Sequence, residues 1–394
     1  MAATCGTFGW LAALHDVATT LSPTRDVVVA YDLEGRPSSW FVSGDTFKRS
    51  LGSEVYGRRT EDGVRRRWRV EPGRARELFA QALEVAGEAE EALERGVALT
   101  GPESTAEMQA RLDRIAAWTP ETLMAESERF SAAYAPISIL PPDQYGSVVL
   151  QATFGCTWNR CTFCTFYQDR PFQVRPIAEF DEHLLAVERL LGRAAQGRRR
   201  VFLADGNALV LANERLRPLF ASASRVFPGR PVAGFVDVFS GEKKPPEAWR
   251  ELRELGLSSV AIGVETGHDP LLEYLNKPGS ADQAADFVGL LKEAGLSVAV
   301  ILMVGVGGRP FAAGHQRDSS ELLGRLPLGE GDIVYLSPFV RHGDSPYAQR
   351  AEEEGLEELS AEERSAQDRA LRAAARSAVP AARVATYHID EFVY

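Results

Sequence analysis

The regular alternation of short apolar runs and helical segments between residues 147 and 336 most restricts how this chain can fold. Apolar runs predict six strands, at residues 147–153, 200–204, 232–236, 259–264, 297–304 and 333–336. Helical patterns separate the runs, with glycine or proline at nearly every junction. Such alternation is typical of a parallel α/β sheet with right-handed crossovers. Because a closed eight-unit barrel needs about 250 residues, we expect an open, partial (β/α)6 barrel over residues 145–340.

The flanking segments have a different character. Residues 1–140 combine β-like runs at 27–31 and 40–43 with helical patterns that begin at Ala75, so we expect an N-terminal α+β domain of unknown role. Further helices are predicted at 89–97 and 108–118. A proline-rich connector at 136–142 marks the boundary. Residues 341–394 predict a C-terminal helical extension with a strand-like end at 387–394.

Composition narrows the class of protein. The chain has 394 residues, 45% of them hydrophobic, which excludes a disordered or fibrous chain. A net charge of −11 argues against general binding to nucleic acid or to an anionic membrane. No apolar run reaches the roughly 18–20 residues of a membrane span, and no Lys or Arg precedes Arg25 as a signal peptide requires. We therefore expect a cytoplasmic protein whose thiols stay reduced.

Polar or glycine-rich residues follow the predicted strands. Catalytic groups of such folds lie at the carboxyl ends of the strands, so these residues are expected to share one pocket. They are a cysteine-rich loop after the first strand, then Asp205-Gly206-Asn207, Asp237, Glu265-Thr266-Gly267, Gly305 and Ser337-Pro338.

The cysteine-rich loop carries Cys156, Cys161 and Cys164 in a C-x4-C-x2-C spacing. Three thiolates this close can surround one soft metal centre. A disulfide between two of these cysteines would leave the third thiol unpaired. A structural zinc site needs a fourth ligand, and the next histidine that could supply it, His183, lies inside a predicted helix. An iron–sulfur cube normally takes four thiolates. With three, one iron keeps an open coordination position of the kind that catalytic metals use.

The loop and the later strand ends resemble the radical S-adenosylmethionine (radical SAM) superfamily. The usual spacing there is C-x3-C-x2-C with an aromatic residue before the last cysteine, the place of Phe163, and one extra residue follows Cys156 here. The segment Gly263-Val264-Glu265-Thr266-Gly267, followed by Asn276-Lys277, resembles the "G-x-E-[ST]-G…N-K" segment of one large branch. The resemblance covers about residues 145–340.

The resemblance implies a [4Fe-4S] cluster held by the three cysteines and SAM chelated to its open iron. One electron from the reduced cluster would cleave SAM to methionine and a 5′-deoxyadenosyl radical, which abstracts hydrogen from a substrate. A small-molecule substrate and an electron donor of the flavodoxin or ferredoxin type are the implied partners. No further cysteine cluster and no D-x-H-x-x-G signature appear, so a second cluster or a cobalamin domain is not expected.

Family contacts to SAM map onto particular residues. Asp205-Gly206-Asn207 stands in the place of the glycine-rich turn that meets the methionine amino group, although the usual Gly-Gly-Glu is absent. Glu265 is placed at the ribose or the methionine part, and Asp237 at the ribose or the substrate. Gly305 would let adenine approach the backbone, and Phe163 would pack near adenine. The resemblance assigns no catalytic residue.

Two other functions remain open at this stage. The chain could be a zinc or iron–sulfur sensor on a barrel scaffold, or an RNA-modifying member of the family. The second would use Arg65-Arg66-Arg67-Trp68-Arg69, which we interpret instead as a hairpin face offset by acidic neighbours. His268, His315 and His342 each follow a strand and could face the pocket. Cys5 stands apart from the other cysteines as a lone thiol.

Overall fold

The computed structural model describes residues 10–61, 64–96, 99–100, 105–343, 345–389 and 392–394, so Cys5 lies outside the described residues. The chain divides into two compact units. Unit 1 comprises residues 1–136, 186–198 and 393–394, and unit 2 comprises residues 137–185 and 199–392.

Unit 1 is built on an antiparallel sheet in the order β7-β6-β5-β4-β3-β2-β1, with β8 added in parallel beside β1. Its strands are β1 (Leu11–His15), β2 (Ala18–Thr24), β3 (Val27–Tyr31), β4 (Pro37–Val42), β5 (Asp45–Arg49), β6 (Val55–Glu61), β7 (Val64–Arg69) and β8 (Leu99–Thr100). Its helices are α1 (Pro72–Glu94), α2 (Thr105–Ala116) and α3 (Pro120–Ala133). The N-terminal α+β domain that the sequence predicts therefore consists of a sheet with three helices.

The core of unit 1 lies between the sheet and these helices. Alternate strand residues such as Leu21, Val29 and Trp40 point to one face, where they pack with Leu78 and Phe79 of α1. α1 begins at Pro72, a residue suited to the first turn of a helix, and runs on without a break. The separate helix predicted at 89–97 is wrong, because residues 89–94 are the last turns of α1.

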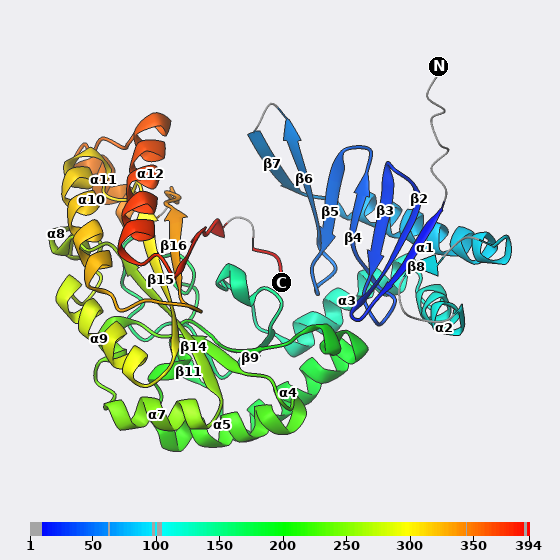
Figure 1. Ribbon diagram of the computed structural model, residues 1–394, viewed down its shortest axis with the longest axis horizontal. Coiled ribbons are helices and arrows are strands. Elements are labelled where there is room, and N and C mark those ends of the chain that lie inside the picture. Colours follow the sequence, from blue (N-terminus) through cyan, green and yellow to red (C-terminus); the bar gives the residue numbers. More distant parts are fainter. Residues whose placement is uncertain (1–9, 62–63, 97–98, 101–104, 344, 390–391) are drawn as a thin grey trace. The chain divides into compact units, whose positions relative to one another are not determined.

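Unit 2 contains a parallel sheet in the order β17-β16-β15-β14-β13-β12-β9 (Figure 1). Its strands are β9 (Val148–Gln151), β12 (Val201–Ala204), β13 (Val232–Phe235), β14 (Leu257–Glu265), β15 (Ser297–Val304), β16 (Ile333–Pro338) and β17 (Arg383–Thr386). The expected parallel α/β sheet is confirmed, with β9 and β17 at its two ends. A small antiparallel pair, β10 (Thr153–Phe154) and β11 (Gln173–Val174), flanks the cysteine-rich loop.

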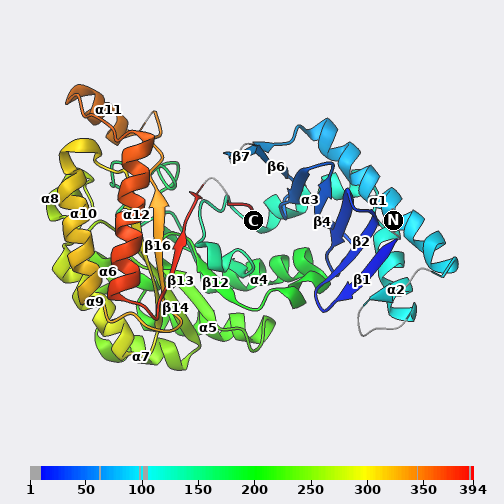
Figure 2. The ribbon, with the colours of Figure 1, turned by 45° about the horizontal axis from the view of Figure 1, so that its top comes forward.

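Helices connect the parallel strands and lie along the outer side of the sheet (Figures 1 and 2). They are α4 (Ile177–Leu191), α5 (Asn213–Val226), α6 (Val238–Gly241), α7 (Pro246–Glu254), α8 (Asp269–Tyr274), α9 (Ala281–Glu293), α10 (Gly308–Arg325), α11 (Pro346–Glu353) and α12 (Ala361–Ala378). Short 3-10 turns occur at η1 (Pro142–Gln144), η2 (Gly192–Gly197) and η3 (Ala208–Val210). Figure 2 shows α12 beside α10, next to β16.

The C-terminal segment differs from its prediction. The strand forms at Arg383–Thr386, before the predicted 387–394, and it pairs in parallel with β16. Its backbone satisfies the free edge of β16, and this pairing extends the sheet to a seventh strand. The predicted strand at 387–394 is wrong for the residues that the structure describes there.

Candidate active site

One cavity of about 190 Å³ lies at the carboxyl ends of the parallel strands of unit 2. Parallel strands direct the residues that follow them to a common edge, so side chains far apart in sequence meet there. The sequence-predicted residues that line it are Cys156, Cys161, Phe163, Cys164, Gly206, Asp237, Glu265, Ser337, Pro338 and His342. Asp205, Asn207 and Gly305 do not line it.

The cysteine-rich loop follows β10 and is held by backbone and side-chain bonds. Asn159 takes a left-handed conformation with φ of 47°, and its amide donates to the carbonyl oxygen of Tyr167 at 2.7 Å. The Thr162 amide donates to Leu275 at 2.9 Å, and the amide of Cys164 donates to Cys161 at 3.2 Å. These bonds fix the loop that carries the three thiols.

The three cysteines are free and partly buried. Burial raises the pKa of Cys161 to about 11 and that of Cys164 to about 12, so these thiols keep their protons until a cation binds. Within the described residues, no three Cys, His, Asp or Glu side chains converge closely enough for one metal ion. In an iron–sulfur cube each thiolate binds a different iron.

Glu265 and Lys277 form an ion pair inside the cavity, with 3.4 Å between Nζ and Oε1. Burial raises the pKa of Glu265. Burial opposes the charged form of Lys277, but the neighbouring acidic groups, Glu265 first, outweigh it and raise the lysine pKa above its ordinary value. The Glu265 carboxylate lies against Gly263, where any Cβ would collide with it. The small residue of the G-x-E segment therefore makes room for this ion pair.

The turn after β12 brings its three residues to different places. Asp205 is buried, its Oδ2 has no hydrogen-bond partner among the described residues, and burial raises its pKa to about 6. Gly206 faces the cavity, where a Cβ would lie 2.6 Å from the Tyr167 ring. The Asn207 amide donates to Thr157 Oγ1 at 2.7 Å and to Asp237 Oδ2, and so ties this turn to the loop and to the end of β13.

Phe163 and Gly305, both predicted to lie near adenine, have different surroundings in the structure. Phe163 lines the cavity and packs against an apolar cluster that includes Leu271 and Met303. Gly305 follows β15 with φ of 88°, and its amide donates to Gln367 of α12 at 2.7 Å. The glycine therefore fits a turn against α12 and lies away from the cavity wall.

Several cavity residues were missed by the site prediction. Lys277 has a sequence signal, since it ends the N-K pair twelve positions after Glu265. The other missed residues have no such signal, because they alternate with core positions on their strands or come from the cysteine-rich loop, the connector and the C-terminal segment. They include Ile139, Phe166, Phe235, Ile301, Met303, Phe339, Tyr387 and Ile389.

The three histidines that follow strands lie in different places. His342 lines the cavity. His268 bonds through Nδ1 to Asp318 at 2.6 Å, away from the cavity. His315 is buried, which lowers its pKa to about 4, and it bridges Thr266 and the Met303 carbonyl at 2.7 and 2.8 Å. It stays neutral and braces the segment that carries Glu265.

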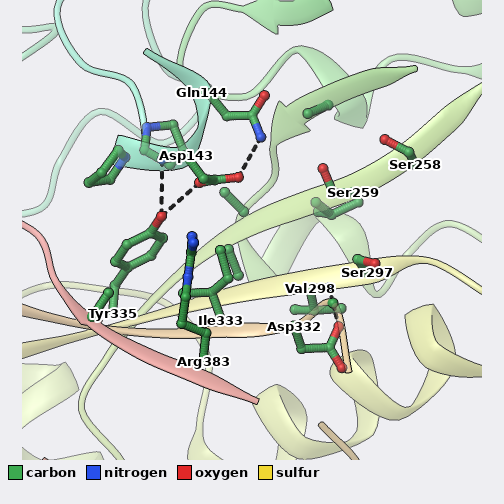
Figure 3. Close-up of a pocket in the computed structure, with 18 of the residues that line it drawn as sticks. Asp143, Gln144, Ser258, Ser259, Ser297, Val298, Asp332, Ile333, Tyr335 and Arg383 are labelled. Carbon is green, nitrogen blue, oxygen red and sulfur yellow. Dashed lines mark hydrogen bonds between the residues drawn. The ribbon is translucent and has the colours of Figure 1, made fainter. Parts of the chain in front are cut away.

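A larger cavity of about 860 Å³ lies at the opposite, amino-terminal ends of the strands (Figure 3). Ser259, Ser297 and neighbouring alanines form its wall, and Tyr335 closes one side through a 2.8 Å bond to Asp143. None of the sequence-predicted site residues lines it. The chemistry-bearing side chains gather at the other end of the sheet.

Across the described residues, no helix is both long and apolar enough to cross a membrane.

Comparison with known proteins gives a family for the core of unit 2. Residues 150–312 match the model of the Radical SAM superfamily. No curated protein matches the sequence. The structure is similar to the radical SAM methyltransferase TsrM from Kitasatospora setae, at 16% identity and a TM-score of 0.42, over 56% of this chain and 44% of that one.

Two further solved structures show similar values. Methylornithine synthase (PylB) has 17% identity and a TM-score of 0.43, over 61% of this chain and 72% of that one. Coproporphyrinogen III oxidase (HemN) from Escherichia coli has 16% identity and a TM-score of 0.43, over 63% of this chain and 55% of that one. The chain spans less than half the length of TsrM. The superfamily works with a [4Fe-4S] cluster and SAM, and its model begins in the strand before the three cysteines; this chain therefore contains a radical SAM domain.

Proposed function

We propose that this protein is an enzyme that cleaves SAM reductively and uses the resulting radical to abstract hydrogen from a small-molecule substrate. The observation that carries the proposal is the meeting of three free thiols and a buried Glu265–Lys277 pair in one cavity of the domain that matches the superfamily. Remote segments of the chain have been brought together there around groups that are costly to bury without a ligand.

Cys156, Cys161 and Cys164 would hold the cluster. When bound, a [4Fe-4S] cluster supplies one electron that splits SAM into methionine and a 5′-deoxyadenosyl radical. The chain itself keeps the thiols on a loop fixed by Asn159 and Thr162, and it surrounds them with apolar side chains that exclude water. Exclusion of water protects a reactive radical from side reactions.

The charged pair suits the two ends of a zwitterionic ligand. The Lys277 ammonium can donate hydrogen bonds to a carboxylate, and the Glu265 carboxylate can accept them from ribose hydroxyls or an ammonium group. Gly206 offers backbone at the cavity wall, next to Asp205, whose buried Oδ2 lies 3.7 Å from the Arg170 guanidinium and has no hydrogen-bond partner among the described residues. This supports a role of the turn at the methionine amino group. Asp237 shares the cavity and is oriented by Asn207, a positioning residue. Phe163 supplies an apolar surface for adenine, and Gly305 would act through the turn against α12.

The remaining cavity wall points to the class of substrate. Phe166, Phe235, Ile301 and Ile389 make it mainly apolar, with His342 among the few polar groups. The small volume supports a small molecule over a folded macromolecule. Reduced thiols and a low-potential cluster also support a cytoplasmic location and an electron donor of the flavodoxin or ferredoxin type.

The test is anaerobic purification and reconstitution, followed by incubation with dithionite and SAM and an assay for 5′-deoxyadenosine. We expect a brown protein with about four irons per chain that forms 5′-deoxyadenosine. Cys161→Ala should lose both properties, and Cys5→Ala, which removes the one cysteine outside the loop, should keep its iron. A fully reduced cluster that leaves SAM intact would refute the proposal.

Two alternatives give different results in the same experiment. A zinc-loaded, colourless protein would favour a zinc sensor, and a brown protein inert toward SAM would favour an iron–sulfur sensor. For an RNA-modifying enzyme, the arginine-rich hairpin would have to bind phosphate. In this hairpin Arg69 pairs with Glu54 at 2.5 Å and Arg59 pairs with Asp45 at 2.5 Å. Part of the positive charge of the hairpin is therefore already neutralised.

A further inference from the structure

The loop between Cys156 and Cys161 presents a row of aromatic and cationic side chains. The Trp158 ring lies 6.0 Å from the Phe239 ring, which comes from α6. The Arg160 guanidinium lies 5.5 Å from the Trp158 ring, and the Lys243 ammonium lies 3.6 Å from the Phe239 ring. We name these four residues the cluster-loop patch. Its order, Arg160–Trp158–Phe239–Lys243, places an aromatic centre between two cations.

The cluster-loop patch is held in place before any partner binds. The indole nitrogen of Trp158 donates to the carbonyl oxygen of Asn276 at 2.8 Å, and the Asn276 amide donates back to the Arg160 carbonyl at 2.8 Å. Side chains ordered in advance lose little conformational freedom on binding. An aromatic centre with a charged rim is also the usual anatomy of a protein interface.

The charge of the cluster-loop patch contrasts with that of the molecule. Arg160 and Lys243 are exposed, and among the described residues no carboxylate forms an ion pair with either. The nearby Glu242 carboxylate accepts two bonds from the Gln283 amide, at 2.9 and 3.0 Å. The chain as a whole carries a net charge of −11. An acidic partner would therefore be attracted to this place.

The position of the cluster-loop patch indicates what the partner does, an argument that rests on the proposed function. Cleavage of SAM consumes one electron, and electron transfer weakens steeply with distance. Trp158 and Arg160 lie on the loop that joins two of the three proposed cluster ligands. We propose that the cluster-loop patch is the docking surface for an acidic one-electron carrier protein. The carrier is oxidised by one electron, and that electron ends in cleavage of the sulfonium carbon–sulfur bond of SAM.

Lys243→Glu is the decisive variant, because it lies on a different segment from the cysteines and leaves their loop intact. The probe is an acidic flavodoxin, whose dissociation constant is measured by calorimetry on the reconstituted protein at low and moderate salt. We expect Lys243→Glu to weaken binding about tenfold and to flatten its salt dependence, since one favourable charge becomes a repulsive one. Arg160→Ala should weaken binding about threefold to fivefold.

The matched control is Arg376→Ala, an exposed arginine in the last turn of α12. It should leave the dissociation constant unchanged. Formation of 5′-deoxyadenosine driven by subsaturating reduced flavodoxin should fall with binding in Lys243→Glu, whereas formation driven by dithionite should stay within about twofold of the parent.

The possible outcomes separate the inference from the proposed function. If dithionite yields no 5′-deoxyadenosine in the parent, the proposed function fails, and flavodoxin binding still tests the patch. If dithionite works and Lys243→Glu binds flavodoxin as the parent does, the docking surface is wrong. Binding of RNA that Lys243→Glu abolishes, without binding of flavodoxin, would also overturn it.

Discussion

Lys277 and Glu265 illustrate how much depends on single residues in the proposed site. Both side chains are largely buried, with exposed fractions of 13% and 11%, and each is the other's ion-pair partner. Removal of one partner leaves an uncompensated charge in a poorly solvated place, which costs more than the pair itself contributes. The pair therefore has two roles, in the stability of unit 2 and in the proposed recognition of SAM.

Lys277→Met should lower the free energy of unfolding by about 3 kcal/mol, measured by urea denaturation, and should weaken SAM binding. The double variant Lys277→Met/Glu265→Gln should recover part of the stability, because no buried charge is then left alone, but it should not recover SAM binding. Lys243→Ala, which removes an exposed lysine, should change stability by less than about 0.5 kcal/mol. Equal losses in Lys277→Met and Lys243→Ala would contradict the structural role of the pair.

The buried Asp205 carboxyl should make the stability of the fold depend on pH. Burial raises its folded-state pKa to about 6, whereas an unfolded aspartate titrates near 4. Folding therefore favours the protonated carboxyl, and its contribution to stability is fully present below about pH 4 and is lost as the pH rises through about 6. Asp205→Asn should gain stability relative to the parent between these two values. Parallel stability curves for the two proteins, from unfolding at a series of pH values, would show that Asp205 does not titrate in this way.

At the scale of elements, the cysteine-rich loop depends on the conformation of one residue. Asn159 has φ of 47°, and its amide also bonds to Tyr167. Asn159→Ala should destabilise the loop by about 2 kcal/mol, half from the left-handed backbone and half from the lost hydrogen bond. Asn159→Gly keeps the backbone freedom and should lose about half as much. Iron content after reconstitution should be highest in the parent, lower in Asn159→Gly and lowest in Asn159→Ala. An unchanged iron content in Asn159→Ala would refute this account.

The sequence predicts those elements that have strong local patterns. The strands of unit 2 and the loop of thiols are visible because their apolar runs and cysteine spacing are local. β17 is missed because Arg383–Thr386 is short and mostly half-buried, and only its pairing with β16 makes it a strand. The hydrogen bond of Gly305 to α12 is equally non-local. Lys277 could be found from the N-K pair, whereas the apolar cavity wall depends on which strand face turns inward.

At the scale of the whole molecule, the two units are interleaved along the chain. Unit 1 includes residues 186–198, which lie between segments of unit 2 in sequence. Arg36, whose exposed fraction is 1%, holds this segment to the rest of unit 1. Its guanidinium donates to Glu126 at 2.8 Å and to the backbone carbonyls of Leu190 and Leu191 at 2.8 and 3.1 Å. Unit 1 therefore completes its own core only after the chain has passed through the first part of unit 2.

Arg36→Met tests whether the units unfold separately. The substitution leaves Asp32 and two carbonyls without this partner and should cost unit 1 about 3 kcal/mol. Hydrogen exchange should then speed up at core amides of α1 such as Leu78 and Phe79, and stay slow at Val300 and Leu302 of β15. Arg129→Met removes the other, half-exposed partner of Glu126 and should cost less than about 1 kcal/mol. Equal acceleration in α1 and β15 would mean that the interleaved chain unfolds as one cooperative unit, with residues 186–198 transmitting the loss from the antiparallel sheet to the radical SAM domain.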